Sequence, residues 1–520
     1  MSNNVSYKVD NKRIAKNSLY LYIRMFFVLI ISLFTVRVTL RVLGEEDYGI
    51  NNVVGGVVTM FTFLTSSLSS ASLRFFSFNL GKNDYLQLSK YFTISFWCYA
   101  ILAFIIFVLS ETVGYFLIFK QLTIPEERWI AATFVYQFSI FALLIKLLVV
   151  PFNSLIIAHE RMDFFAILGI IEVIVKLLVT VLIYISPFDK LISYGILIFI
   201  AYTLVDLTYV FYCLKYFKES RIMILWNSNI FKDLFRFSGW TLFGTISDIV
   251  RAQGINILLN LYFGPVVNAA RAIAYQINSH VNQFVMNFYK AVQPQITKSC
   301  GSGDFSNMNL LVYRSSRYCF YLIFLIALPI ILEANYILSV WLKDVPEYTV
   351  VFTRLVILAA IIDSMSYPLN TAIQATGNIK YFQLVTGSFL MLSLPLSWMF
   401  LRIGFPPETT MYVGIFISVC AQFLRIYFSI RIAKLSISDY FRNVLQRILF
   451  SILCSVIVPT IIVLIMEDSI LRFLIVVSSS IIFSFMSFWL VGISDQEKQV
   501  FSSIIKQKIY APVNKRIFAK

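Results

Sequence analysis

The sequence predicts an all-α polytopic membrane protein with about fourteen transmembrane helices, and three observations support this prediction. The 520 residues are 59% apolar and only 13% charged, whereas soluble chains are typically about 45–50% apolar and about 25% charged. The mean hydropathy is +0.79. Apolar runs of membrane length recur along the whole chain between short polar breaks. Because a soluble fold needs a polar shell, this composition excludes a soluble enzyme and a disordered chain.

Each apolar run is long enough to cross a bilayer core, which requires about 20 residues in a helix. The runs cover residues 18–41, 48–72, 91–110, 129–150, 164–186, 191–214, 234–261, 265–292, 318–342, 349–375, 381–401, 410–430, 445–466 and 470–492. The first, second, seventh and eighth runs are unusually rich in polar residues. Since no run alternates like a membrane β-barrel strand, every span is expected to be helical.

The distribution of Lys and Arg predicts the orientation of the chain. With the N-terminus placed in the cytoplasm, twenty-six Lys and Arg residues lie in or beside the inside loops and the C-terminal tail, against seven outside. The positive-inside rule then places both termini in the cytoplasm. The formal net charge of +16 therefore mainly records topology and does not indicate a nucleic-acid partner.

Sequence motifs for catalysis and cofactor binding are absent. The chain has no P-loop, and His159 and His280 lie far apart, with no Cys/His spacing that indicates a metal site. The six cysteines form no C-x-x-C pair and are interpreted as small apolar side chains. We therefore expect no catalytic residue, no metal and no cofactor.

An internal repeat divides the chain. Residues 38–91 and 258–311 match without a gap, and the match pairs Gly44 with Gly264, Gly81 with Gly301 and Asp84 with Asp304. Because the offset spans six helices, both halves have the same orientation, as in transporters built from parallel repeats. The predicted domains are an N-terminal lobe (1–217, spans 1–6), a C-terminal lobe (218–433, spans 7–12), and residues 434–520 with spans 13 and 14 and a basic cytoplasmic tail.

Two stretches of the repeat carry a family resemblance: Gly-Glu-Glu-Asp-Tyr-Gly at 44–49 with Val-Val-Gly-Gly at 53–56, and 256–271 with its Phe-Gly-Pro-Val-Val-Asn-Ala-Ala-Arg run. They resemble bacterial polysaccharide-biosynthesis flippases of the Wzx (O-antigen) type. These belong to the multidrug/oligosaccharidyl-lipid/polysaccharide exporter (MOP) superfamily, which includes the multidrug (MATE) exporters. The resemblance implies two six-helix, MATE-like lobes around a central cavity, plus two C-terminal helices, and alternating access.

Polar residues inside the spans are candidates for substrate binding. A charge at a helix centre costs about 2.5–3.5 kcal/mol on insertion scales, so it usually faces a cavity or a partner. Amide and aromatic groups suit sugars, and guanidinium groups suit phosphates. The candidate cavity residues are Arg24, Asp248, Arg251, Arg271, Tyr275, Asn278 and Asn282. Arg24 is included because the resemblance favours cationic residues in the first span, and snorkelling is its alternative.

Two other interpretations of these residues remain open. Small and amide side chains also pack helices against one another in membranes. Asp248 and Arg251, three residues apart, are also placed to neutralise each other on the helix surface.

Further charged residues inside the spans are candidate coupling residues. They are Glu172, Lys176, Asp206 and Asp363. Glu172 and Lys176 are four residues apart in the fifth span, and Lys146 lies at similar depth in the fourth. The alternatives are a structural ion-pair cluster and a site that couples transport to a proton or another cation.

The function predicted from these features is transport by alternating access. The resemblance implies that the substrate is a polyprenyl-pyrophosphate-linked oligosaccharide, an O-antigen or capsule repeat unit, moved from the cytoplasmic to the periplasmic leaflet of a bacterial inner membrane. The alternatives are a MATE-type cation-coupled multidrug exporter and, disfavoured by the short outside loops, a membrane glycan polymerase or ligase. Expected partners are the lipid-linked oligosaccharide, membrane lipids and, as a candidate, the glycan polymerase machinery.

Overall fold

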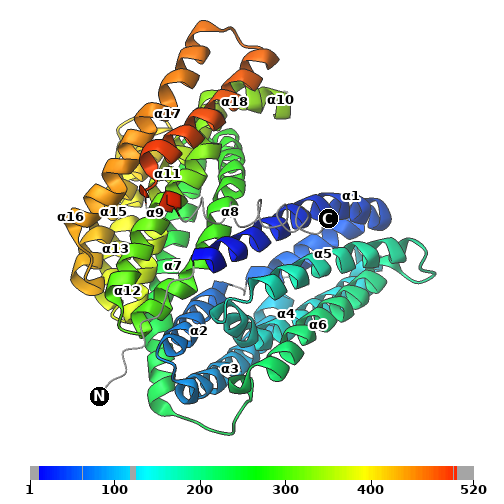
Figure 1. The fold of residues 1–520 in the computed structure, drawn as a ribbon. Coiled ribbons are helices and arrows are strands. Elements are labelled where there is room, and N and C mark those ends of the chain that lie inside the picture. Colours follow the sequence, from blue (N-terminus) through cyan, green and yellow to red (C-terminus); the bar gives the residue numbers. More distant parts are fainter. Residues whose placement is uncertain (1–10, 61–62, 117–124, 343, 496, 500–520) are drawn as a thin grey trace, which may run out of the picture. The chain divides into compact units, whose positions relative to one another are not determined.

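The computed structural model describes residues 11–60, 63–116, 125–342, 344–495 and 497–499, and every regular element among them is helical (Figure 1). The basic tail from residue 500 lies outside the described residues. Within the described part, eleven helices are long and apolar enough to cross a membrane. The all-α membrane fold is thus confirmed, whereas the count of fourteen spans is not. The predicted spans at 48–72, 234–261 and 265–292, three of the four most polar runs, are not among the eleven.

The chain divides into two compact units. The first consists mainly of Arg13–Leu242 and Thr297–Asp304, and the second of Phe243–Ile296 and Phe305–Lys520. These two units do not test the predicted lobes, so the limits of the lobes at residues 217 and 433 stay predictions.

Helices of the first unit follow one another through short connections. They are α1 Asn11–Met60, α2 Phe63–Gly81, α3 Tyr85–Leu109, α4 Trp129–Ala158, α5 Met162–Tyr184 and α6 Lys190–Tyr216. Short π or 3₁₀ turns lie at Ser110–Gly114, Glu126–Arg128 and Lys218–Ser220. Two long helices, α7 Ser228–Phe263 and α8 Pro265–Gly301, contribute residues to both units.

The remaining helices belong to the second unit. They are α9 Phe305–Leu332, α10 Ala334–Leu342, α11 Thr349–Ser364, α12 Ser366–Thr376, α13 Lys380–Met391, α14 Ser393–Arg402, α15 Thr409–Ala433, α16 Ile437–Tyr440, α17 Gln446–Ile465 and α18 Ile470–Ser487, with π turns Phe441–Leu445 and Phe488–Gly492. Two predicted single helices are interrupted, at Met365 and at Leu392. The interruptions lie three residues before Pro368 and Pro395, because a proline cannot donate the i→i−4 hydrogen bond and clashes with the preceding turn.

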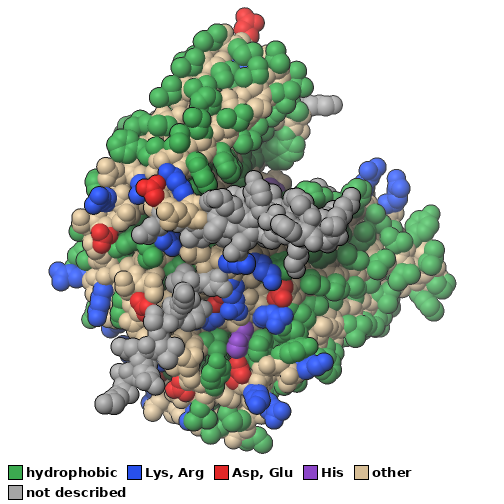
Figure 2. Space-filling model, viewed as in Figure 1, with side chains coloured by type: hydrophobic (Ala, Val, Ile, Leu, Met, Phe, Trp, Pro, Cys, Tyr) green, Lys and Arg blue, Asp and Glu red, His purple; other side chains and the backbone are tan. Residues whose placement is uncertain are grey.

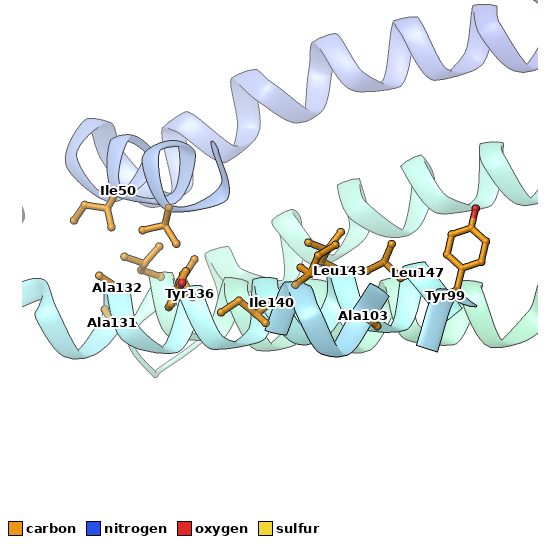
Figure 3. Packing of buried hydrophobic residues seen from close by; sticks show 13 residues of the cluster. Ile50, Tyr99, Ala103, Ala131, Ala132, Tyr136, Ile140, Leu143 and Leu147 are labelled. Atoms are coloured by element: carbon orange, nitrogen blue, oxygen red, sulfur yellow. The ribbon is translucent and has the colours of Figure 1, made fainter. Parts of the chain in front are cut away.

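Each unit has its own apolar core. In the first unit, α4 contributes Tyr136, Ile140 and Leu147, which pack with Tyr99 of α3 and Ile50 of α1 (Figure 3). In the second unit, the core joins α7, α8, α11 and α15 through Ile255, Leu259, Val267, Ala270, Ala274, Phe352, Val356 and Met411. The small side chains on α8 let these backbones approach closely, as is common between membrane helices.

The backbone repeats its geometry at the positions that the sequence pairs. Gly44 has a φ of 81° and Gly264 a φ of 78°, a left-handed conformation that favours glycine. After α2, the backbone amide of Asp84 donates to the carbonyl of Asn79 at 3.0 Å. After α8, the backbone amide of Asp304 donates to the carbonyl of Ser299 at 3.0 Å. The same helix kink and the same helix ending therefore recur in both halves of the repeat.

Candidate functional site

Arg271 is held at the start of α8 by groups of the second unit. Its Nη1 donates a hydrogen bond to Oδ1 of Asn256 on α7, and its guanidinium lies 4.3 Å from the ring centroid of Tyr275. The residue is 5% exposed, and its buried Nε has no hydrogen-bond partner. A buried donor without a partner is costly, so this guanidinium retains capacity for an anionic group.

Asp248 and Arg251 lie on one face of α7 as a loose ion pair. Nη2 of Arg251 is 3.7 Å from Oδ1 of Asp248, with side-chain exposures of 27% and 59% respectively. Such exposed pairs contribute little to stability, about 0–1 kcal/mol. Both groups therefore remain accessible to a ligand.

The two candidate amides of α8 are engaged inside the second unit. Nδ2 of Asn282 donates to Oδ1 of Asn278 at 2.7 Å, and the hydroxyl of Tyr367 on α12 donates to Oδ1 of Asn282 at 3.4 Å. Two turns further along, Tyr289 of α8 shares a hydrogen bond with Thr371 of α12. We call Asn278, Asn282 and Tyr289 the inner polar stripe of α8, and through Asn282 and Tyr289 it joins α8 to α12.

A second polar face of α8 is exposed, and only Tyr275 among its residues was identified from the sequence. It consists of Tyr275, Gln276, Ser279, His280 and Gln283. Their spacing of one and then three residues places them on one side of a helix, and this spacing is the signal by which the sequence reveals them. Polar side chains on a membrane-length helix avoid lipid and line a water-filled space, so we define these five residues as the exposed polar face of α8.

The other charged candidate of the second unit has a partner that was also missed. Oδ1 of Asp363 on α11 is 3.5 Å from Nη1 of Arg425 on α15, and Ser418 donates to the same carboxylate at 3.3 Å. The signal for Arg425 is an arginine inside the apolar run 410–430.

Three charged residues of the first unit meet at one cavity. Lys146 of α4, Glu172 of α5 and Asp206 of α6 line a cavity of about 260 Å³. Asn51, Tyr194 and Tyr202 also line it, together with Val135, Phe138, Ser139, Ala142, Leu143, Gly195, Ile198, Phe199 and Val205. Lys176 is not among the lining residues. The walls are thus mostly apolar, with a cation and two carboxylates from three helices converging on the space.

Arg24 packs against α5 within the first unit. Its guanidinium carbon lies 4.8 Å from the ring centroid of Phe165. A Cβ at Gly169 would lie 2.1 Å from its Nε, so only glycine admits this side chain. Its Nε is buried without a hydrogen-bond partner. Arg24 therefore does not simply extend into water.

Residues 14–299, more than half of the chain, match the model of the family described as polysaccharide biosynthesis protein. No individual curated protein sequence matches the chain significantly. A crystal structure of a MATE protein in complex with MaD3S aligns with a TM-score of 0.70 at 13% identity, over 81% of this chain and 96% of its own.

Two further solved structures agree with this fold. The MATE transporter ClbM in complex with Rb⁺ has a TM-score of 0.67 and 14% identity, over 83% of this chain and 97% of its own. A MOP superfamily transporter from Pyrococcus furiosus, described by the reverse polarity of its binding pocket, has a TM-score of 0.66 and 11% identity. The alignment covers 84% of this chain and 99% of that transporter. The chain therefore belongs to the polysaccharide biosynthesis protein family and has the fold of the MATE transporters of the MOP superfamily.

Proposed function

We propose that this transporter flips a polyprenyl-pyrophosphate-linked oligosaccharide from the cytoplasmic to the periplasmic leaflet of a bacterial inner membrane, by alternating access with both termini cytoplasmic. The observation that carries the proposal is the exposed polar face of α8 in a chain of the polysaccharide biosynthesis family. Hydroxyl, amide and imidazole groups on one helix face offer both donors and acceptors, which sugar hydroxyls require.

The charged groups of α7 and α8 suit the pyrophosphate. Arg251 is partly exposed beside Asp248, and Arg271 has an unused buried donor. Guanidinium groups bind phosphate oxygens with two parallel hydrogen bonds. In this proposal Tyr275, which stacks on Arg271 and belongs to the exposed polar face, connects the phosphate-binding and sugar-binding parts.

The cavity of the first unit is the candidate coupling site. Glu172 and Asp206 line it with only Lys146 as a cationic neighbour among the lining residues. A proton or another monovalent cation that binds these carboxylates would change the charge of a mostly apolar space, which is a costly change that a transporter can link to its conformation. The complex of ClbM with Rb⁺ supports a cation site on this fold, and Asp363 with Arg425 is the candidate in the second unit.

Cation-coupled export of drugs is the second candidate, favoured by the MATE neighbours. A cationic drug requires a predominantly acidic cavity. The polar stripes of α7 and α8 instead carry Arg251 and Arg271 against one acidic residue, Asp248. A deletion strain that loses surface glycan and keeps its drug resistance would support the flippase, and the reverse result would support the exporter. If the deletion strain displays glycan repeat units on its surface but does not polymerise them, the protein would be a glycan polymerase.

The direct test is protection of a lipid-linked oligosaccharide from an external probe in liposomes, with and without the purified protein. We expect the double variant Gln276→Leu/Gln283→Leu to lower flipping at unchanged abundance, because it removes two amides from the exposed polar face. Gln87→Leu, on the first turn of α3, is the matched control and should flip normally. Equal protection with and without the wild-type protein would refute the proposal.

A further inference from the structure

The segment that joins α6 to α7 displays apolar and basic side chains side by side. We call residues 215–236 the linker. It begins where α6, a candidate membrane span, ends at Tyr216. Within it, Ile224 is fully exposed, and Trp226 and Phe235 are more than half exposed. In Figure 2, green and blue side chains gather at the lower edge of the view, where the green connection into α7 runs in Figure 1.

Both acidic residues of the linker are engaged inside the first unit. Oε1 of Glu219 lies 2.6 Å from Nε2 of His159, and Glu219 is buried. Tyr91 donates its hydroxyl hydrogen bond to Oδ2 of Asp233 at 3.2 Å. The basic residues of the linker are all exposed, and of the two acidic residues only Asp233 is: the basic residues are Lys215, Lys218, Arg221, Lys232 and Arg236. The exposed surface of the linker therefore carries five cationic groups against the single carboxylate of Asp233 and is net positive.

A groove at the first turns of α7 combines the two kinds of side chain. This cavity of about 540 Å³ is lined by Asn229, Phe231, Lys232, Asp233, Phe235 and Arg236. The rings of Trp226 and Phe231 lie 5.0 Å apart, and those of Phe231 and Phe235 lie 5.8 Å apart. The groove thus has a continuous aromatic wall with two cationic groups beside it, and its one carboxylate, Asp233, accepts a hydrogen bond from Tyr91.

We propose that the linker is an interfacial anchor that binds anionic phospholipid headgroups, with Lys232 and Arg236 on the phosphate and Trp226 and Phe235 among the upper acyl carbons. Basic clusters next to a membrane span are attracted to anionic lipid surfaces, and Trp is enriched at the membrane interface. The exposed apolar side chains of α6, such as Phe211, continue into the linker at Tyr216. Charged residues are depleted from the centres of protein interfaces, which disfavours a protein as the occupant.

The test uses the full-length protein in detergent, titrated with dioleoyl phosphatidylglycerol or dioleoyl phosphatidylcholine, with bound lipid measured by native mass spectrometry. Each basic group near an anionic surface contributes about fivefold in affinity, so Lys232→Gln/Arg236→Gln should weaken phosphatidylglycerol binding about 30-fold. Lys190→Gln/Arg402→Gln, which removes two exposed basic groups elsewhere, should leave it unchanged.

Three results would overturn the proposal. They are equal binding of phosphatidylcholine, an equal loss of binding in the control pair, and displacement of phosphatidylglycerol by inorganic diphosphate, which would indicate a site for a free anion. If Lys232→Gln/Arg236→Gln does not fold, Ile224→Ser/Trp226→Ser tests the apolar contribution. Unchanged phosphatidylglycerol binding in that variant would equally refute the anchor.

Discussion

The close approach of Arg24 to Gly169 permits a quantitative test of how the candidate site in α1 is built. A Cβ at Gly169 would lie 2.1 Å from Nε and 2.9 Å from Cδ of Arg24. These atoms are not the flexible end of the side chain, so Gly169→Ala must displace the whole guanidinium. Overpacking of this kind costs about 1–3 kcal/mol, whereas alanine in a helix interior gains about 0.8–1.0 kcal/mol over glycine.

We therefore expect Gly169→Ala to lower the free energy of unfolding by about 0–2 kcal/mol in the wild-type background, from the difference of these terms. In an Arg24→Ala background the clash is absent, and Gly169→Ala should raise the free energy of unfolding by about 1 kcal/mol. The interaction energy of the double-mutant cycle is then about 1–3 kcal/mol.

The assay is reversible unfolding of the four proteins in mixed micelles. Gly239→Ala in α7 is the matched control, since apart from its chain neighbours and its own helix backbone no described atom lies within 4 Å of its Cβ position. It should stabilise the protein by up to about 1 kcal/mol in both backgrounds. If the effects of Gly169→Ala and Arg24→Ala are additive, the two side chains do not meet and the placement of Arg24 against α5 is wrong.

Three other predictions concern buried charges. Glu160→Gln should cost about 3–5 kcal/mol in unfolding measurements because it leaves Lys298 buried without its carboxylate, whereas Asp495→Asn, at an exposed pair, should cost less than about 1 kcal/mol. Burial alone would raise the pKa of Glu497, but two neighbouring arginines and a backbone amide shift it below its ordinary 4.5. The ionised Glu497 carboxylate therefore stabilises the fold above about pH 4.5, and this stabilisation is lost on further acidification. In unfolding measurements over a pH series, the free energy of unfolding of Glu497→Gln should fall less steeply below about pH 4.5 than that of the wild type. Asp206→Asn should abolish coupled transport in liposomes at normal protein abundance.

The fold could be predicted from composition and periodicity because a membrane imposes strong rules on both. Eleven of the predicted spans are apolar helices in the structure. The breaks predicted between the spans at 41–48 and 261–265 contain Gly44 and Gly264, which the repeat pairs and which both have a positive φ. The interruption at Met365 was less evident, because a proline three residues later can bend a helix without ending it.

The site was predicted less completely because a stripe of polar residues does not reveal which side of its helix is packed. Arg425 was missed although it lies in an apolar run, since its partner Asp363 is distant in sequence and only the fold brings them within 3.5 Å. Lys176 was grouped with Glu172 by helical spacing, yet only Glu172 lines the cavity with Lys146 and Asp206.

The polarity of α8 on two faces is the feature that most constrains the mechanism. If the inner stripe with Asn278 and Asn282 were the substrate site, each binding event would have to break the bond between these two amides within α8 and the bond from Tyr367 that joins α8 to α12. Such breakage leaves buried polar groups unpaired, at about 1–3 kcal/mol each. The exposed face with Gln276, His280 and Gln283 has a lower cost, because its side chains are exposed and of these three only Gln283 has a hydrogen bond in the described part of the structure, donated to Oδ1 of Asn287 at 3.5 Å. The proposed transport of a large, hydrated glycan would therefore engage the exposed face at lower cost, while the inner stripe keeps α8 joined to α12.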